Sequence, residues 1–511
     1  ILYFSVNIDM RLISGFILLF CVSCSAQQFL QRDIQSSVED QFPKILSEFR
    51  EFLTIKNDGH FPEQINNNLV WCKEALKKRK FEVTVLSSNG IPHLLGKRIF
   101  DSSLPTVLVY MQIDGQPVSP AEWDQTDPFE ATLKIKSGDR WLKQKWEAPF
   151  NKESRIFARS ASDSKGPTMA FLSALDILDL KRIKPAFNIK CIMDFQEEMG
   201  SPGLPDLIIK NKDLFDARAV LIMDGTRHVS NLPTLNFGAR GIATIKLKVF
   251  GANTELHSGQ YGNYAPNPVF KLAKLLAGMK DENGKVLIPK FYDGIEISAK
   301  DKELLRNMPG DDLELNQRIG IKSPERVGDN YEESLQYPSL NVRGLRAADI
   351  GQDVRTIIPA EAIAEIDMRL VPETPGQRQI DLIKAYISSQ GYHFVKDNPT
   401  DEERKVYDKL ISFDYKIGSK PFRTDLDSPF GLWLSRSMDR VFGKGNYVNQ
   451  RTTGGSQPIE PFITTLGIPA VSIRFPNPDN NIHAANENLS IGAFIEGIEM
   501  CVGVLTEPMS K

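Results

Sequence analysis

Four short apolar runs, each followed closely by polar residues, set the strongest limit on how this chain can fold. They read TVLVYMQID, NIKCIMDFQEE, AVLIMDGT and PAVSIRF. Near-continuous apolar runs of this kind are typical of parallel strands that are buried on both faces of a sheet. Between the first two runs, KGPTMAFLSALDILDLK has apolar residues at helical spacing, namely Met169, Leu172, Leu175 and Leu178. The alternation of strand, helix and strand predicts an open α/β sheet.

A middle segment follows a different pattern. GIATIKLKVFG and AEAIAEIDMRLVP alternate between apolar and polar residues, and PVFKLAKLLAGMKD between them has helical spacing. Half-buried strands with covering helices predict a smaller α+β domain. We place this domain at residues 238–420, inserted into a larger domain that comprises residues 27–237 and 421–511.

Residues 1–26 have the features of an export leader. MRLISGFILLFCVSC starts with Met10 and Arg11 and ends before the polar residues SAQQ. Its apolar run is well short of the ~20 residues that span a bilayer, which favours a secretory signal peptide. CVSC resembles a bacterial lipobox with Cys24 as the lipidated residue, and cleavage after Ala26 is the alternative. We therefore expect export, to the bacterial periplasm or as an outer-membrane lipoprotein.

Charge and cysteine content exclude other classes. The net charge of −3 gives no basic footprint for nucleic acid, so no nucleic-acid partner is expected. The 5 cysteines are scattered, which argues against a disulfide framework.

Polar residues at the predicted strand ends indicate a metal site, because ligands of open α/β sheets bind outside the carboxyl ends of the strands. One acidic residue there is most often a helix cap. Here several acidic residues and a histidine could converge on one crevice: Asp114, Asp163, Glu197, Glu198, Asp224 and His483. Adjacent carboxylates need a compensating positive charge. A divalent cation supplies that charge, and oxygen ligands with imidazole suit zinc or manganese.

Five fragments, in order along the chain, carry a family resemblance. ARSASDSKGP, QEEMGS, ELHSGQYGNYAPNP, RTIIPAEAIAEIDMRLVP and RTTGGSQP resemble segments of the co-catalytic zinc peptidase and deacylase family. This family includes carnosine dipeptidases, glutamate carboxypeptidase and succinyl-diaminopimelate desuccinylase. The resemblance covers nearly everything after residue 40 and is strongest to the dipeptidase branch. It implies a catalytic domain with a central mixed sheet flanked by helices, and an inserted lid and dimerisation domain.

The resemblance also implies roles at the metal centre. Asp163 would bridge two metal ions, and Glu198 and His483 would complete one metal site. Asp224 would bind the other ion, together with a ligand from the MQID turn. Glu197 would be the general base, which takes a proton from a water molecule and passes it to the leaving amine. The cofactor would be Zn²⁺, one or two ions per subunit, with Mn²⁺ or Co²⁺ as alternatives.

Further residues are implied in substrate binding. His257, on the lid, would reach the active site of a partner in a homodimer and stabilise the oxyanion. Arg369 would bind a substrate carboxylate as a bidentate fork, although a surface ion pair with Asp367 is the structural alternative. The peptide backbone would be held by Thr356 and by the turn formed by Gly454, Gly455 and Ser456.

Gln112 departs from the family pattern, which has a histidine at this position. Asp114, grouped with the catalytic residues, normally orients that imidazole. An amide oxygen is a weaker zinc ligand than imidazole, and loss of even an outer partner lowers metal affinity ~10–100-fold. We expect the Asp163–Asp224 site to be weak or empty. Ser164 replaces the second Asp of an Asp-Asp pair, a residue that is not itself a ligand.

The sequence therefore predicts a zinc-dependent metallopeptidase that cleaves dipeptides or short peptides. Two alternatives stay open. The chain could be an impaired relative that acts as a binding scaffold, because Gln112 replaces a ligand. It could also be an N-acyl amino acid deacylase of the same architecture.

Overall fold

The computed structural model describes residues 31–509. The predicted leader, with Cys24 and its cleavage site, lies outside the described residues. None of the helices within residues 31–509 is long and apolar enough to cross a membrane.

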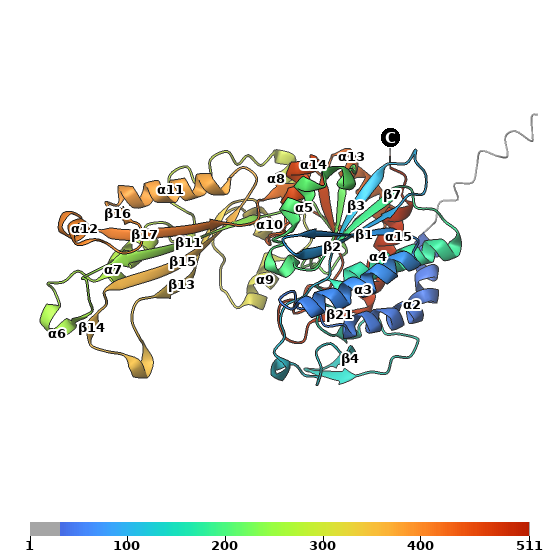
Figure 1. Ribbon diagram of the computed structural model, residues 1–511, viewed down its shortest axis with the longest axis horizontal. Coiled ribbons are helices and arrows are strands. Elements are labelled where there is room, and N and C mark those ends of the chain that lie inside the picture. Colours follow the sequence, from blue (N-terminus) through green and yellow to red (C-terminus); the bar gives the residue numbers. More distant parts are fainter. Residues whose placement is uncertain (1–30, 510–511) are drawn as a thin grey trace, which may run out of the picture.

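An eight-stranded mixed sheet forms the centre of the larger part of the molecule (Figure 1), with strand order β1-β2-β7-β3-β8-β20-β9-β19. The four apolar runs form four adjacent parallel strands in it: β7 (Asn188–Asp194), β3 (Thr106–Gln112), β8 (Val220–Met223) and β20 (Ala470–Arg474). Their predicted strand structure is confirmed. The flanking strands are β1 (Glu82–Ser88), β2 (Ile91–Arg98), β9 (Thr234–Asn236) and β19 (Val448–Gln450).

Helices cover both faces of this sheet, and the strand periodicity decides which residues meet them. Val109, Met111 and Leu221 belong to the core shared with α2 (Gln31–Thr54), α3 (Pro62–Lys78), α4 (Lys165–Lys181), α13 (Pro429–Phe442) and α15 (Ile491–Thr506). Their neighbours Tyr110 and Ile222 belong to the opposite core, with α5 (Leu204–Lys210) and α14 (Glu460–Leu466). Burial on both faces is why these strands have no polar alternation.

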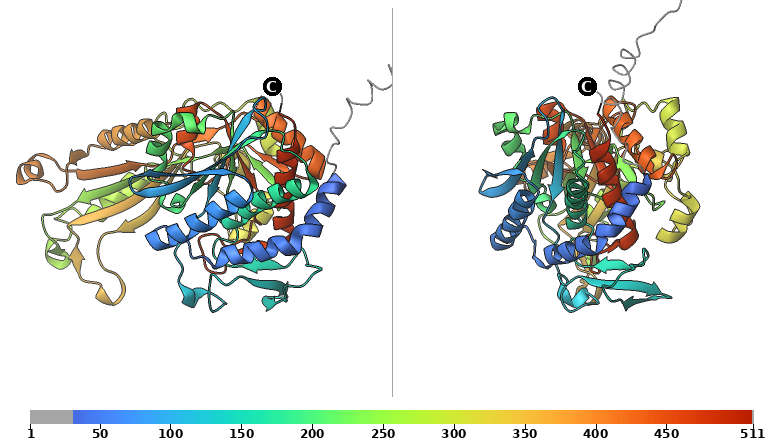
Figure 2. Two further views of the ribbon diagram at one scale, coloured as in Figure 1. Left: turned by 45° about the vertical axis from the view of Figure 1, so that its right-hand side comes forward. Right: turned by 90° about the vertical axis from the view of Figure 1, so that its right-hand side faces the viewer.

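A second sheet extends away from the first (Figures 1 and 2). Its strand order is β13-β15-β11-β17-β16, with β13 (Ser339–Arg346), β15 (Glu361–Leu370), β11 (Gly241–Phe250), β17 (Leu410–Ile417) and β16 (His393–Val395). Alternate residues of β11 and β15 pack in a separate core with α7 (Pro268–Ala277) and α11 (Gly376–Ser389). The domain boundaries at 237/238 and 420/421 stay predictions.

Smaller elements complete the described chain. A four-stranded sheet, β21-β6-β4-β5, joins β21 (Asn488–Ser490), β6 (Arg155–Phe157), β4 (Thr132–Ser137) and β5 (Arg140–Lys143). The pair β12 (Leu256–His257) and β14 (Ile357–Ile358) lies with α6 (Ser258–Tyr261) towards the far end of the extension (Figure 1). The pair β10 (Gly238–Ala239) and β18 (Phe422–Arg423) connects the two parts. The remaining helices are α8 (Ala299–Arg306), α9 (Asp312–Ile319), α10 (Tyr331–Ser334) and α12 (Asp401–Val406).

Candidate metal and catalytic site

A cavity of about 550 Å³ lies at the carboxyl ends of the parallel strands. Polar residues from the ends of four strands, and from loops on either side, line it. Among them are Gln112, Gln116, Asp163, Glu197, Glu198, Asp224, Ser456, Gln457, Arg474 and His483. This is the position at which open α/β sheets bind ligands.

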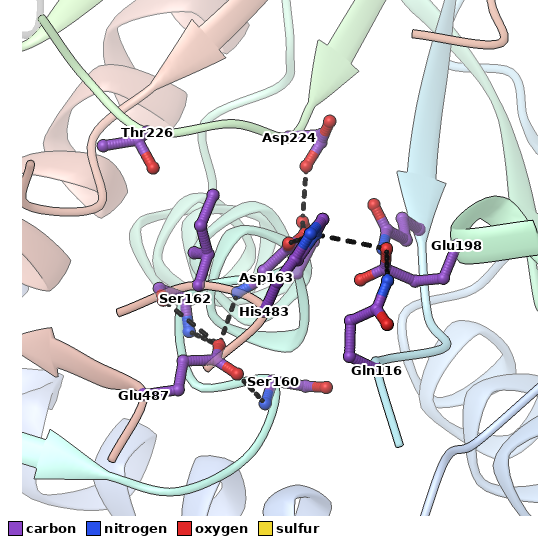
Figure 3. Close-up of polar contacts among 12 residues, drawn as sticks. Gln116, Ser160, Ser162, Asp163, Glu198, Asp224, Thr226, His483 and Glu487 are labelled. Atoms are coloured by element: carbon purple, nitrogen blue, oxygen red, sulfur yellow. Dashed lines mark hydrogen bonds and ion pairs between the residues drawn. The ribbon is translucent and has the colours of Figure 1, made fainter. Parts of the chain in front are cut away.

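Three of the predicted metal ligands converge in this cavity (Figure 3). His483 Nε2 lies 3.1 Å from Asp163 Oδ2 and 3.2 Å from Glu198 Oε2. One donor atom of each residue lies within 4.8 Å of the other two. Glu198 Oε1 is buried and has no hydrogen-bond partner within the described chain. Two carboxylates and an imidazole with a spare buried oxygen fit a divalent ion such as zinc.

Burial and crowded negative charge shift the pKa values of the residues in this cluster. Burial raises the pKa of Asp163 to about 7, although its hydrogen bond with His483 lowers it. Hydrogen bonds with Asp163 and Glu198 raise the pKa of His483 to about 10. Burial, followed by the charges of nearby carboxylates, raises the pKa of Glu197 well above its usual range. These shifts reflect a concentration of negative charge that a divalent cation would neutralise.

Glu487 fixes the loop that carries Asp163. Its carboxylate accepts hydrogen bonds from the main-chain N–H groups of Ser160 (2.9 Å), Ser162 (3.0 Å) and Asp163 (2.9 Å). It also pairs with Arg159 at 2.8 Å, and its side chain is fully buried. The Glu487 carboxylate therefore holds the loop of residues 160–163 in place. Figure 3 shows its contacts with these residues.

A tight turn brings Glu197 and Glu198 to the same cavity. Strand β7 ends at Asp194, and the chain enters the 3₁₀ helix η2 (Glu197–Met199), so strand alternation no longer separates neighbouring side chains. Asp114 has no imidazole to orient. Its carboxylate instead accepts hydrogen bonds from the main-chain N–H groups of Glu197 (2.9 Å) and Glu198 (3.1 Å). Gln116 donates from Nε2 to Glu198 Oε2 at 2.8 Å.

Asp224 lies in the cavity with different partners. Its Oδ1 is 2.7 Å from Ser164 Oγ, and its Oδ2 accepts a hydrogen bond from Gln457 Nε2 at 2.9 Å. Gln112 directs its Nε2 towards the main-chain oxygen of Asp114 at 3.5 Å. The two residues predicted for a second metal site are thus engaged with protein groups.

Arg369 and the glycine turn lie at the border of the cavity. Arg369 donates from Nη1 to Ser456 Oγ at 2.9 Å, and Gly455 and Ser456 line the cavity. The main-chain oxygen of Gly454 accepts a hydrogen bond from Arg240. Asp367, the alternative partner of Arg369, is bonded to Asn341 at 2.8 Å instead.

Two predicted site residues lie far from the cavity of their own chain (Figure 1). His257 and Thr356 are exposed, on or beside the pair β12 and β14 at the far end of the extension. Their roles towards a partner subunit stay predictions.

Several residues of the cavity were missed in the sequence. Gln457 directly follows the GGS turn, and Gln116 lies two residues after Asp114, so both positions were close to recognised motifs. Arg474 lies within the fourth apolar run as the last residue of β20, and the predicted metal ligands there were acidic residues and histidine. Glu487 lies four residues after His483 and carried no separate signal.

The mixed sheet, with carboxylates and a histidine at its strand ends, defines the molecule as an open α/β protein with a candidate metal site. The chain belongs to the peptidase family M20/M25/M40, whose family model matches residues 108–507. The predicted family and fold class are therefore confirmed.

Known proteins of similar sequence and structure agree with this assignment. The Cys-Gly metallodipeptidase dug1 of Schizosaccharomyces pombe is 27% identical over 429 residues, covering 80% of this chain and 81% of that protein. The Beta-Ala-His dipeptidase of Mus musculus is 25% identical over 430 residues, covering 81% and 80%. The structure of the M20 family metallo-carboxypeptidase Sso-CP2 from Sulfolobus solfataricus superposes with a TM-score of 0.73 at 27% identity, covering 91% of this chain and 99% of that one.

Proposed function

We propose that this protein is a zinc-dependent dipeptidase that hydrolyses the amide bond of dipeptides or short peptides. The observation that carries the proposal is the carboxylate of Glu197 in the same cavity as the cluster of Asp163, Glu198 and His483. The names of the similar proteins, a Cys-Gly metallodipeptidase and a Beta-Ala-His dipeptidase, support dipeptides as the substrate class.

Each residue has a distinct part in this reaction. Asp163, Glu198 and His483 would hold the divalent ion, which lowers the pKa of a water molecule and polarises the scissile carbonyl. Glu197 takes the proton of the attacking water and gives it to the leaving amine.

Substrate orientation is assigned to the border of the cavity. The Arg369 guanidinium lies beside Ser456, and a guanidinium can bind the terminal carboxylate of a dipeptide as a bidentate fork. Gly455 presents its main chain next to this position. A free carboxylate at a fixed distance from the metal would restrict the enzyme to short substrates.

A substitution pair tests the proposal against a dipeptide panel with added zinc, manganese or cobalt. Glu197→Gln keeps the shape and removes the proton acceptor, so hydrolysis should fall by ~10²–10⁴-fold while metal content stays near wild type. Glu198→Gln should lose metal and activity together. Near-full activity of Glu197→Gln would overturn the assignment of the base. Turnover only of N-acyl amino acids would favour a deacylase, and no turnover of either class would favour a scaffold.

We infer further that the protein is a homodimer through the smaller sheet and that it is exported. His257 and Thr356 are too remote to serve their own cavity, and exposed Tyr264, Phe270 and Ile350 give this region apolar surface.

The leader sequence supports cleavage within residues 20–28, with lipidation of Cys24. A monomer in sedimentation, or an uncleaved chain recovered from the cytoplasm of its native cell, would contradict these two inferences.

A further inference from the structure

Arg474 has a buried guanidinium for which residues 31–509 provide no hydrogen bond or ion pair. Its side chain is only 5% exposed, and it lines the cavity. Its Nε has no hydrogen-bond partner, and within residues 31–509 the guanidinium forms no ion pair. A buried charge is costly unless it is compensated, so this position calls for nearby negative charge.

The register of the sheet indicates that Asp224 provides this negative charge. Ile222 of β8 pairs with Tyr110 of β3 on one side and with Ser472 of β20 on the other. The paired residues end at Ser472–Ile222 and Met111–Met223, and the same register, continued past the strand ends, brings Gln112, Asp224 and Arg474 into one row. Side chains two residues apart point to the same face, so Arg474 is the direct neighbour of Asp224.

Packing and charge agree with this register. The guanidinium lies over the chain just after Asp224, where a Cβ added to Gly225 would be 2.6 Å from Arg474 Nε. Burial lowers the pKa of Arg474 to about 10, while the charges of Asp224 and Asp163 favour its protonated form. A positive charge is thus already present beside the two carboxylates.

The same row fits a second divalent ion poorly. Both oxygens of Asp224 have protein partners, Ser164 and Gln457. Gln112 offers a neutral amide in place of an imidazole. His228, the other histidine that lines the cavity, is held by Glu332 at 3.0 Å and cannot replace it. A second dication here would also lie next to the guanidinium and be repelled by it.

We infer that this site holds one divalent ion per subunit, at Asp163, Glu198 and His483, and that Arg474 takes the place of a second cation beside Asp224. The inference rests on the proposed function in taking those three residues as metal ligands. It goes beyond the weak second site expected from Gln112, because it names the charge that replaces the second ion.

The experiment measures zinc per subunit by elemental analysis, after saturation with Zn²⁺ and gel filtration of the full chain. Wild type and Gln112→His should each bind one equivalent, because Arg474 still occupies the second position. Gln112→His combined with Arg474→Met should bind two. Gln112→His combined with Arg474→Lys keeps the charge and should stay at one.

A matched control is Gln112→His combined with Arg227→Met. Arg227 is also a buried arginine of this cavity, but it is paired with Glu496 at 2.7 Å, so the count should stay at one. Two equivalents in wild type, or one equivalent in a folded Gln112→His, Arg474→Met protein, would overturn the inference. If that double variant does not fold, the test rests on wild type and on Gln112→His combined with Arg474→Lys. Each should bind one equivalent of zinc, and two equivalents in either would overturn the inference. No bound zinc in wild type would instead count against the proposed function.

Discussion

At the scale of single residues, Glu487 shows how much of the site depends on a group that never touches the metal. Its fully buried carboxylate accepts hydrogen bonds from three main-chain N–H groups and from the Arg159 guanidinium. Without it, these donors would be buried and unpaired, each at a cost of ~1–3 kcal/mol. Glu487 is therefore a positioning residue for Asp163.

Glu487→Gln tests this role. The amide keeps one acceptor but turns an NH₂ group towards N–H donors, so the loop at residues 160–163 should shift. We expect zinc affinity to fall ~10–100-fold, as for other partners that orient ligands. Isothermal titration with Zn²⁺ measures the affinity. Asp479→Asn is the control, because the Asp479 side chain is 65% exposed in its ion pair with Arg155. Equal affinities for both variants would contradict the role of Glu487.

The metal ligands could be predicted from the sequence, whereas their supporting residues could not. Asp163 and Glu198 stand in recognisable local motifs, and His483 follows the fourth apolar run in a loop at the same end of the predicted sheet. Gln457 and Asp224 are 233 residues apart, and Asp163 and Glu487 are 324 apart. Partners at such separations depend on how the strands are arranged in the sheet, which a single sequence does not specify.

At the scale of elements, the carboxyl ends of β3, β7, β8 and β20 form the floor of the site. The strands themselves could be predicted because apolar runs are a local signal. Their order, β7-β3-β8-β20, could not, and this order places Asp224 between Gln112 and Arg474. The significance of Arg474 therefore appears only when the register is known.

Asp114→Ala tests how the turn after β7 is held. Asp114 accepts the main-chain N–H groups of both Glu197 and Glu198, so its removal frees the η2 turn. Because one turn carries the base and a metal ligand, kcat and zinc affinity should both fall, by at least tenfold. Hydrolysis rates and zinc titration measure the two effects. Asp58→Asn is the control, since Asp58 bonds to the exposed His60. A loss of kcat with unchanged zinc affinity would show that Glu198 is positioned independently.

At the scale of the whole molecule, the larger sheet is packed between a core on each face, and the smaller sheet has a core of its own. The cores of the larger sheet fix the strand ends that build the cavity, and the core of the smaller sheet holds an extension that carries Arg369 near the cavity and His257 far from it. The alternation of β11 and β15 predicted the smaller sheet, because only one face of it is buried. The sequence pattern could not show how far this sheet projects.

Global stability should depend on pH through Glu499, a residue of α15 that is 5% exposed. Burial, and then the charge of Glu496, raises the pKa of Glu499 from 4.5 to about 7. A carboxyl with a raised pKa in the folded state favours folding while it is protonated. Its contribution is therefore full below about pH 4.5 and is lost as the pH rises to about 7, on the order of 3 kcal/mol in total.

Glu499→Gln removes this titration and keeps the shape of the side chain. The variant should be more stable than wild type at pH 8, by up to ~3 kcal/mol, and close to wild type at pH 5. Urea unfolding at the two pH values measures the difference. Glu303→Gln, at an exposed position of α8, should change stability little at either pH. An equal effect of Glu499→Gln at both pH values would mean that Glu499 stays charged in the fold, since only a group that takes up a proton on folding links its stability to pH.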